Sequence, residues 1–350
     1  MDILNNTIIT YDSIKACVDA NNKEIDNYSV KMGDLLFQRS SETLEDVGRA
    51  NVYMDEKPAI FGGFVIRGKK KGEYNPFFFK NLLETPFSRR KIIPMGAGAQ
   101  HFNIGQEGLS KVKLYFAPIN EQNKIAKILS LLDDRISTQN KIIEDLKKLK
   151  SAISKQVFAQ EPNGWSRLDT LFSKGKAGGT PTSTNKEYYN GEIPFLSIND
   201  ITKQGKYVRY TENHLSQSGL ENSSAWVVPK YSLIMSMYAS VGLVTINEIP
   251  ITTSQAMFAM QLKDKDLLDY LYYYLSYFKY RHIHKYLETG TQSNINADIV
   301  RGIMIPTYGH SRNMEIASTL QGIDVKIDNE LSVLKLFNRQ KNYLLSQIFI

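Results

Sequence analysis

The sequence has little of what builds disulfide-bonded or membrane-bound proteins. Its 350 residues include one cysteine, Cys17, which excludes a disulfide framework and fits a reducing compartment. No apolar run comes near the roughly 18 residues that a membrane-spanning helix needs. Residues 1–10 mix Asp2, Asn5 and Asn6 with short apolar pairs, unlike a secretory signal. We therefore expect a cytoplasmic protein that has no membrane partner.

Groups that could carry out catalysis are also scarce. His282 and His284 stand two residues apart, which would place them on different faces of a helix. Neither Gly96–Ala99 nor Gly175–Gly179 has the spacing of a dinucleotide loop or a P-loop, so we interpret both as turns. Asn75–Phe78 resembles the Asn-Pro-Pro-Phe tetrad of amino-methyltransferases, but the second proline and a preceding glycine-rich cofactor loop are missing. We interpret this run as a turn as well. We expect no enzymatic activity of this chain alone, no catalytic residue, no cofactor and no metal site.

The charge is only mildly informative. A net charge of +7 and a pI of about 9.1 favour a polyanionic partner such as nucleic acid. Because Lys and Arg are spread over the whole chain, any argument for such a partner has to come from local clusters.

What the sequence does contain is a long internal repeat. Similar residues recur at one constant offset (294 − 103 = 191) without a gap. A unit of this length exceeds the roughly 20–50 residues of solenoid repeats, so it indicates a duplicated domain followed by a helix. The matching segments are Asn103-Ile104 with Asn294-Ile295, Ile125-Ala126 with Ile316-Ala317, and Gln156–Phe158 with Gln347–Phe349.

Two segments, 120–160 and 310–350, have the heptad pattern of a coiled coil. Apolar residues alternate at spacings of three and four residues, and both copies place polar residues at the same two seam positions. We predict two long helices that pair antiparallel; the alternative is that each packs only on its own domain. The first copy's seam is Ile125, Leu129, Leu132, Ile136, Gln139, Ile143, Leu146, Lys150, Ile153 and Val157, and the second copy's is Ile316, Leu320, Ile323, Ile327, Glu330, Leu334, Phe337, Lys341, Leu344 and Ile348.

The segments before these helices, 1–119 and 161–309, combine short β-rich runs with one aromatic helix each. The fold class that we predict is therefore mixed α/β (α+β), as a pseudo-twofold repeat of two globular domains alternating with two long helices. The first globular segment is the shorter one, because Trp165 projects back to a position before residue 1 (165 − 191 = −26). We expect its opening part to be missing.

Two kinds of residue are candidates for binding DNA. Basic residues at the end of each aromatic helix could contact phosphates, although such clusters are often only solvated faces. Amide and hydroxyl residues in the loops that follow could read base edges, although an amide-rich turn that caps the next strand is the alternative. The candidates are Arg89, Arg90, Lys91, Gln100 and His101 in the first copy, and Lys279, Arg281, His282, Lys285, Thr291, Gln292, Ser293 and Asn294 in the second.

The order of soft motifs resembles the specificity (S) subunit of a type I restriction–modification enzyme. In the second copy the resemblance begins with Gly164-Trp165, Leu168, Gly179–Pro181, Tyr188–Gly191, Ile193–Phe195 and Asp200-Ile201. It ends with the Gly290–Gln292 loop, the Ile303–Pro306 strand and the long helix. The first copy contributes Ala117–Gln122 and the helix after it.

The resemblance implies a non-catalytic DNA reader in a DNA-methylation and restriction system. Segments 1–119, N-terminally incomplete, and 161–309 would be target recognition domains that each read half of a bipartite site on double-stranded DNA. The helices would act as spacers and as docking surfaces for methyltransferase (M) subunits, which the restriction–translocase (R) subunit joins. Two alternatives remain: a truncated or silent variant that reads one half-site, or a coiled-coil scaffold without DNA specificity.

Overall fold

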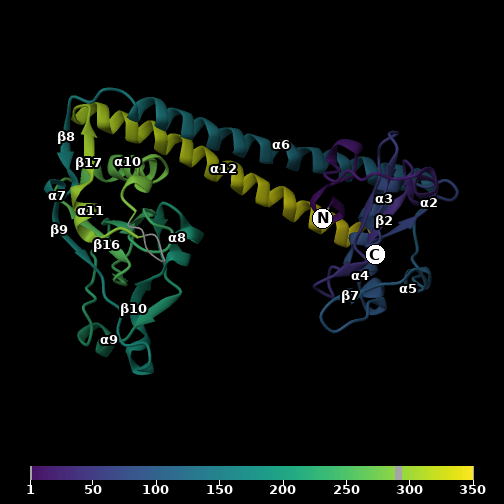
Figure 1. The fold of residues 1–350 in the computed structure, drawn as a ribbon, viewed down its shortest axis with the longest axis horizontal. Helices are drawn as coiled ribbons and strands as arrows, with labels where there is room; N and C mark the ends of the chain where they lie inside the picture. The colour runs from purple at the N-terminus through teal and green to yellow at the C-terminus, as the bar shows by residue number, and fades with distance from the viewer. Residues whose placement is uncertain (1, 288–293, 350) are drawn as a thin grey trace. The chain divides into compact units, whose positions relative to one another are not determined.

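The computed structural model describes residues 2–287 and 294–349 and divides into two compact units. Unit 1 comprises residues 1–143 and 330–350, and unit 2 comprises residues 144–329. Each unit contains a mixed α/β body and a part of both long helices, α6 (Ile119–Phe158) and α12 (His310–Ile348) (Figure 1). The predicted fold class is confirmed.

The body of unit 1 is built on a three-stranded antiparallel sheet in the order β4-β2-β6. Asn75 begins its helix α3 by accepting a hydrogen bond from the amide of Phe78 at 2.9 Å, with Pro76 in the first turn. The Asn-Pro-Phe-Phe run is therefore a helix start and not the turn that we expected. The elements are α1 (Asp2–Asn5), η1 (Tyr11–Ser13), α2 (Asn22–Tyr28), β1 (Ser29–Val30), β2 (Leu35–Gln38), β3 (Ser40–Ser41), β4 (Ala50–Val52), β5 (Ala59–Ile60), β6 (Val65–Gly68), α3 (Pro76–Glu84), α4 (Pro86–Ile92), η2 (Ile93–Met95), β7 (Phe102–Asn103) and α5 (Gln106–Ser110), where η denotes a 3-10 helix.

The body of unit 2 has a larger, five-stranded sheet in the order β11-β14-β13-β16-β9. The glycine-rich run 175–179 is not a turn, because it spans the end of β9 and its exit. The elements are β8 (Gly164–Arg167), α7 (Leu168–Leu171), β9 (Phe172–Ala177), η3 (Lys186–Tyr188), β10 (Tyr189–Leu196), α8 (Ile198–Gln204), β11 (Tyr207–Val208), β12 (Asn213–Leu215), α9 (Gln217–Glu221), β13 (Leu233–Ser236), β14 (Val244–Asn247), β15 (Thr252–Thr253), β16 (Met257–Leu262), η4 (Lys265–Leu267), α10 (Leu268–Arg281), η5 (Ile283–Lys285), α11 (Ala297–Gly302) and β17 (Met304–Thr307).

The sheet of unit 2 is buried on both faces. Successive side chains of a strand point to opposite faces, so Leu233 and Met235 of β13 join the core beneath the aromatic helix α10, while Ile234 joins a second core on the other face. Outside this sheet, β17 pairs antiparallel with β8, which links the end of the body to its beginning.

The seam predicted for the two long helices is confirmed. All twenty predicted positions are buried or half-buried, whereas most of their helix neighbours are exposed. In unit 1 the beginning of α6, at Ala126 and Leu129, packs against the end of α12 at Phe349. In unit 2 the end of α6, at Phe158, packs in one core with Ile316 and Leu320 near the start of α12. The helices therefore pair antiparallel.

The polar seam positions are paired with each other or with a carboxylate. Lys150 Nζ lies 2.5 Å from Asp324 Oδ1 in unit 2, and Lys341 Nζ lies 2.5 Å from Asp133 Oδ1 in unit 1. The repeat offset relates these two ion pairs, because 150 + 191 = 341 and 133 + 191 = 324. Gln139 donates from Nε2 to the backbone oxygen and the carboxylate of Glu330, which is its own repeat partner. Polar groups paired in this way fix one helix register.

Candidate functional site

The aromatic helix of unit 2 is held in place by its tyrosine hydroxyls. Tyr270 and Tyr274 donate hydrogen bonds to backbone oxygens of β17, at 2.6 and 2.9 Å. Tyr273 donates to Asp324 Oδ2 of α12 at 2.7 Å. Burial raises the pKa of each of these phenols, so they remain neutral donors. These bonds fix the first half of α10, so the helix is a fixed platform for what packs on it.

A tight loop after β13 lies against this platform. Ala239 and Ser240 have positive φ angles of 41° and 45°, a strained backbone conformation for residues other than glycine. Ser236 stabilises the loop, because its hydroxyl donates to Ser240 O and accepts from the amide of Leu243. A Cβ on Gly242 would lie 3.3 Å from the Lys279 side chain, so the loop packs closely on α10. We did not predict this loop, whose Tyr238 is exposed; the sequence shows only a short break between two apolar runs.

The predicted basic residues of unit 2 gather at the end of this platform. Arg281 and Lys285 are exposed, and Lys279 is half-buried, with a pKa lowered by that burial. The ring of His282 lies 5.6 Å from that of Phe278. Burial, followed by the charges of Lys285, His284 and Arg281, lowers the pKa of His282 below its ordinary value of 6.5.

The predicted base-reading loop of unit 2 is described only in part. Thr291, Gln292 and Ser293 lie outside the described residues. Asn294 is half-buried, and the next residue, Ile295, is fully buried and donates its amide to Met237 O at 3.0 Å. The end of this loop is therefore joined to the loop that follows β13.

Unit 1 contains the same junction. Ile104, the repeat partner of Ile295 (104 + 191 = 295), is 1% exposed and donates its amide to Arg39 O at 2.9 Å. Arg39 follows β2 as Met237 follows β13. In both units a loop after the aromatic helix is thus fixed to a loop after a sheet strand.

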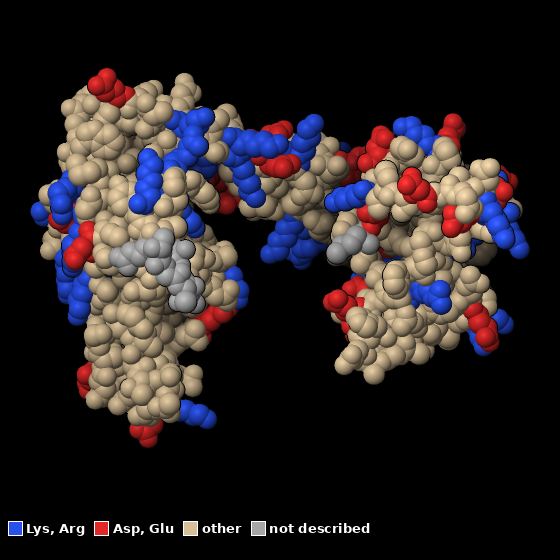
Figure 2. Space-filling view, viewed as in Figure 1, with Lys and Arg blue, Asp and Glu red and all other residues tan. Residues whose placement is uncertain are grey.

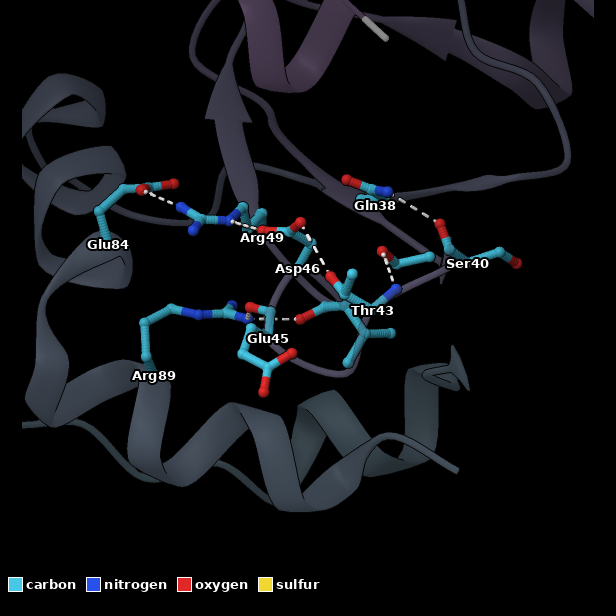
Figure 3. A network of polar contacts seen from close by, with 10 residues as sticks. Gln38, Ser40, Thr43, Glu45, Asp46, Arg49, Glu84 and Arg89 are labelled. Carbon is cyan, nitrogen blue, oxygen red and sulfur yellow. Dashed lines mark hydrogen bonds and ion pairs between the residues drawn. The ribbon is translucent and has the colours of Figure 1, made fainter. Parts of the chain in front are cut away.

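Arg89 fixes the loop that follows β2 in unit 1 (Figure 3). Its guanidinium Nη2 donates to Glu45 O and Val47 O, both at 2.7 Å, and the residue is 8% exposed. Beside it, Arg49 bridges Asp46 and Glu84 at 2.6 and 2.9 Å. Arg89 is therefore turned into the protein, and this geometry does not support contact with phosphate.

The other candidates in unit 1 lie at the surface. Arg90 is exposed, and Lys91 donates to Lys113 O at 2.9 Å with its ammonium 4.2 Å from the ring centre of Phe87. Gln100 and His101 are exposed at the tip of a loop that is closed by two backbone hydrogen bonds between Ala97 and Asn103.

No side chain among the candidates forms a recognisable catalytic group. Within the described residues no three His, Cys, Asp or Glu side chains are grouped as a metal site would require. No helix in the described part of the chain is long and apolar enough to cross a membrane. Each unit thus combines two loops joined by a backbone hydrogen bond with a basic helix end.

Comparison with known proteins agrees with a binding role. The model of the type I restriction modification DNA specificity domain matches residues 1–148 and 162–334. The chain is 25% identical over 335 residues to a Methanocaldococcus jannaschii protein assigned as the MjaX type I specificity subunit, covering 89% of this chain and 76% of that protein. It is 32% identical over 113 residues to the HindI specificity subunit of Haemophilus influenzae, covering 32% of this chain and 24% of that one.

Solved structures share the fold. The S subunit of a type I system from M. genitalium superimposes with a TM-score of 0.56 at 15% identity, covering 93% of this chain and 85% of that one. A chain from a structure on complex assembly and conformational transition of the type I system gives a TM-score of 0.61 at 17% identity, covering 92% and 82%. The chain belongs to the type I restriction–modification DNA specificity family, and it is a specificity subunit, the non-catalytic DNA-recognition component of such a system.

Proposed function

We propose that this specificity subunit recognises a bipartite site on double-stranded DNA, with one half read by each unit. The observation that carries the proposal is the junction of two loops, Ile104 to Arg39 in unit 1 and Ile295 to Met237 in unit 2. Since each unit contains such a loop pair, with different side chains, each pair would present its own pattern of donors and acceptors to base edges. Residues 1–119 and 161–309 would be the target recognition domains, and 120–160 and 310–350 the spacers.

Within each unit we assign two roles to the candidate residues. Gln100 and His101, and in unit 2 Thr291 to Asn294, would read bases. The exposed or half-buried cations Arg90, Lys91, Lys279, Arg281 and Lys285, together with His282, would contact phosphates.

The test is to map the preferred sequence of the assembled methyltransferase, for the unaltered chain and for Gln100→Ala and Gln292→Ala separately. Each variant should relax preference within one half of the motif and leave the other half unchanged. If both variants relax the same half, or if the unaltered complex has no sequence preference, the proposal is wrong.

The proposed protein partners are M subunits, which the R subunit joins. In unit 1, Ile128, Leu131 and Ile142 share one face of α6 and are 52%, 56% and 39% exposed. An exposed apolar stripe at helical spacing fits a partner helix, because burying it removes apolar area from water. Leu131→Glu should weaken association with the methyltransferase, whereas Asn140→Glu, on another exposed face, should not. Equal binding of both variants would contradict this docking surface.

A second candidate is a reader of one half-site. The five-stranded sheet of unit 2 contrasts with the three-stranded sheet of unit 1, and β8 and β9 have no counterpart among the described residues of unit 1. An incomplete first recognition domain would leave the motif with only the half read by unit 2, and the mapping experiment distinguishes the two cases.

We place this activity in the cytoplasm, where the exposed free thiol of Cys17 would remain reduced.

A further inference from the structure

A basic cavity of about 720 Å³ lies in unit 2, where α6, α10, α12 and the turn before β14 meet. Its lining includes five cationic side chains and one carboxylate, Asp324. Its walls also carry four tyrosines and three serines, which add hydroxyl donors. The five cations are Lys147, Lys150, Lys155, Lys279 and Arg281.

The carboxylate neutralises one cation only. Asp324 pairs with Lys150 and also accepts a hydrogen bond from Tyr273, so it belongs to the floor of the cavity. No ion pair joins Lys147, Lys155 or Arg281 to any described residue. All three are exposed, so the cavity is open to solvent on the side where its positive charge is uncompensated. Figure 2 shows Lys and Arg gathered over this part of unit 2.

The excess charge is not a property of the duplicated scaffold. Lys150 is repeated as Lys341, which likewise pairs with a buried carboxylate. The positions equivalent to Lys147 and Lys155 are neutral, Asn338 (147 + 191 = 338) and Ser346 (155 + 191 = 346). The paired lysine therefore serves helix packing, and the unpaired lysines are an addition found in one copy.

We propose that this cavity binds phosphodiester groups of the DNA backbone, so that the long helix α6 is itself part of the DNA-binding surface. Lysine and arginine with serine and tyrosine hydroxyls are the side chains that contact phosphate oxygens in protein–DNA complexes. Arg281 lines the cavity and also belongs to the basic end of α10, so the cavity continues the surface that we propose for phosphate contacts. The inference rests on the proposed DNA-binding function and adds a contact that depends on charge and not on base sequence.

The experiment compares the full chain, assembled with its methyltransferase, with the double variant Lys147→Ala/Lys155→Ala. Each phosphate contact contributes about 0.9 to the slope of log affinity against log salt concentration, so the double variant should have a slope shallower by about 2. Affinity should fall equally for cognate and random duplexes, and the preferred motif should stay the same. The matched control is Lys148→Ala, since Lys148 lies on α6 near Glu144 and Asp145 and does not line the cavity.

Crosslinking identifies the occupant. A photoreactive residue in place of Ser151 should crosslink to duplex DNA. Crosslinking to a partner polypeptide alone would mean that the cavity takes an acidic protein segment, and would overturn the proposal. An unchanged salt slope in a double variant that keeps its thermal stability would also overturn it. Because sequence preference of the unaltered complex is scored in the same assay, failure of the cavity and failure of the proposed DNA-reading function are distinguishable.

Discussion

At the scale of single residues, neighbouring cations of one cluster have different tasks. Arg89, Arg90 and Lys91 are consecutive, but a helix turns by about 100° per residue, so they cannot all face one partner. Arg89 points inward to two backbone oxygens, Arg90 is exposed, and Lys91 is half-buried against an aromatic ring. Composition predicts that a cluster is basic and cannot predict which of its members reaches solvent.

This difference in position predicts that substitution of Arg89 affects folding stability, whereas substitution of Arg90 affects DNA binding. Arg89→Ala should lower the free energy of unfolding by about 2–4 kcal/mol, because it leaves the buried oxygen of Val47 and the partly buried oxygen of Glu45 without a donor. Arg90→Ala should change stability by less than about 0.5 kcal/mol and should reduce the salt slope of DNA binding. Urea unfolding and binding titrations at several salt concentrations measure both quantities. If Arg89→Ala leaves stability unchanged and makes the salt slope of DNA binding shallower, Arg89 contacts phosphate after all.

His282 predicts a pH dependence. In the folded chain without DNA, the pKa of His282 lies below the ordinary 6.5. The unfolded chain therefore binds the proton more readily, and the free energy of unfolding decreases as the pH falls below about 6.5. A DNA phosphate at His282, as we propose, would have the opposite effect on this pKa, because it favours the charged imidazolium. DNA affinity should therefore rise about threefold to tenfold between pH 8 and pH 6, at constant ionic strength.

Two variants isolate the contribution of His282. His282→Gln should remove a large part of the rise in affinity, whereas His214→Gln, on β12, should retain it. If His282→Gln shows the same pH profile as the unaltered chain, this side chain does not contact phosphate.

At the scale of elements, the long helices could be predicted almost residue by residue. The alternation of apolar residues is a local signal, and the polar interruptions at Gln139 and Lys150 recur in both copies. The sheets could not be predicted in the same way. In unit 2, β16 pairs with β9 from the far end of the domain, and such a pairing depends on packing between distant segments that no local pattern records.

The loops proposed to read bases show a similar division. The repeated Asn-Ile dipeptides mark equivalent segments of the two units, but Ile104 and Ile295 are buried and their amides fix the loop pair. The residue repeated between the copies is therefore structural. Since two half-sites need not be alike, side chains that read bases are expected to differ between the copies, and a repeat search does not find them.

The ion pairs of the seam predict a specific stability effect. Asp133 and Lys341 have side chains only 8% and 20% exposed, so removing one partner leaves a largely buried charge unpaired. Asp133→Ala should lower the free energy of unfolding by about 3 kcal/mol, whereas the combined Asp133→Leu/Lys341→Leu change should be close to neutral or stabilising. Urea unfolding followed by circular dichroism measures both. Asp134→Ala, one position along the helix and exposed, is the control. A double variant as unstable as the single one would mean that the pair itself, and not the unpaired charge, is the source of stability.

At the scale of the whole molecule, the proposed bipartite recognition requires the helices to set the spacing between half-sites. One heptad inserted after Gln139 and another after Glu330 preserve the seam pattern and lengthen each helix by about 10.5 Å. At 3.4 Å per base pair this corresponds to about 3 base pairs of DNA. The gap between the two halves of the preferred motif should increase by that amount, as measured by mapping methylated adenines.

The affinity for the lengthened site should nevertheless fall. Three base pairs are about a third of a helical turn of DNA, so the second half-site would also rotate around the duplex axis. Inserting a heptad into α6 alone should be worse, because the pairs Lys150–Asp324 and Lys341–Asp133 lie on either side of the insertion and cannot both keep their register. That single insertion should abolish cooperative folding or methylation. If the doubly lengthened protein instead methylates the original motif with its original gap, the helices do not act as the spacer, and the separation of the half-sites is set by the partner subunits.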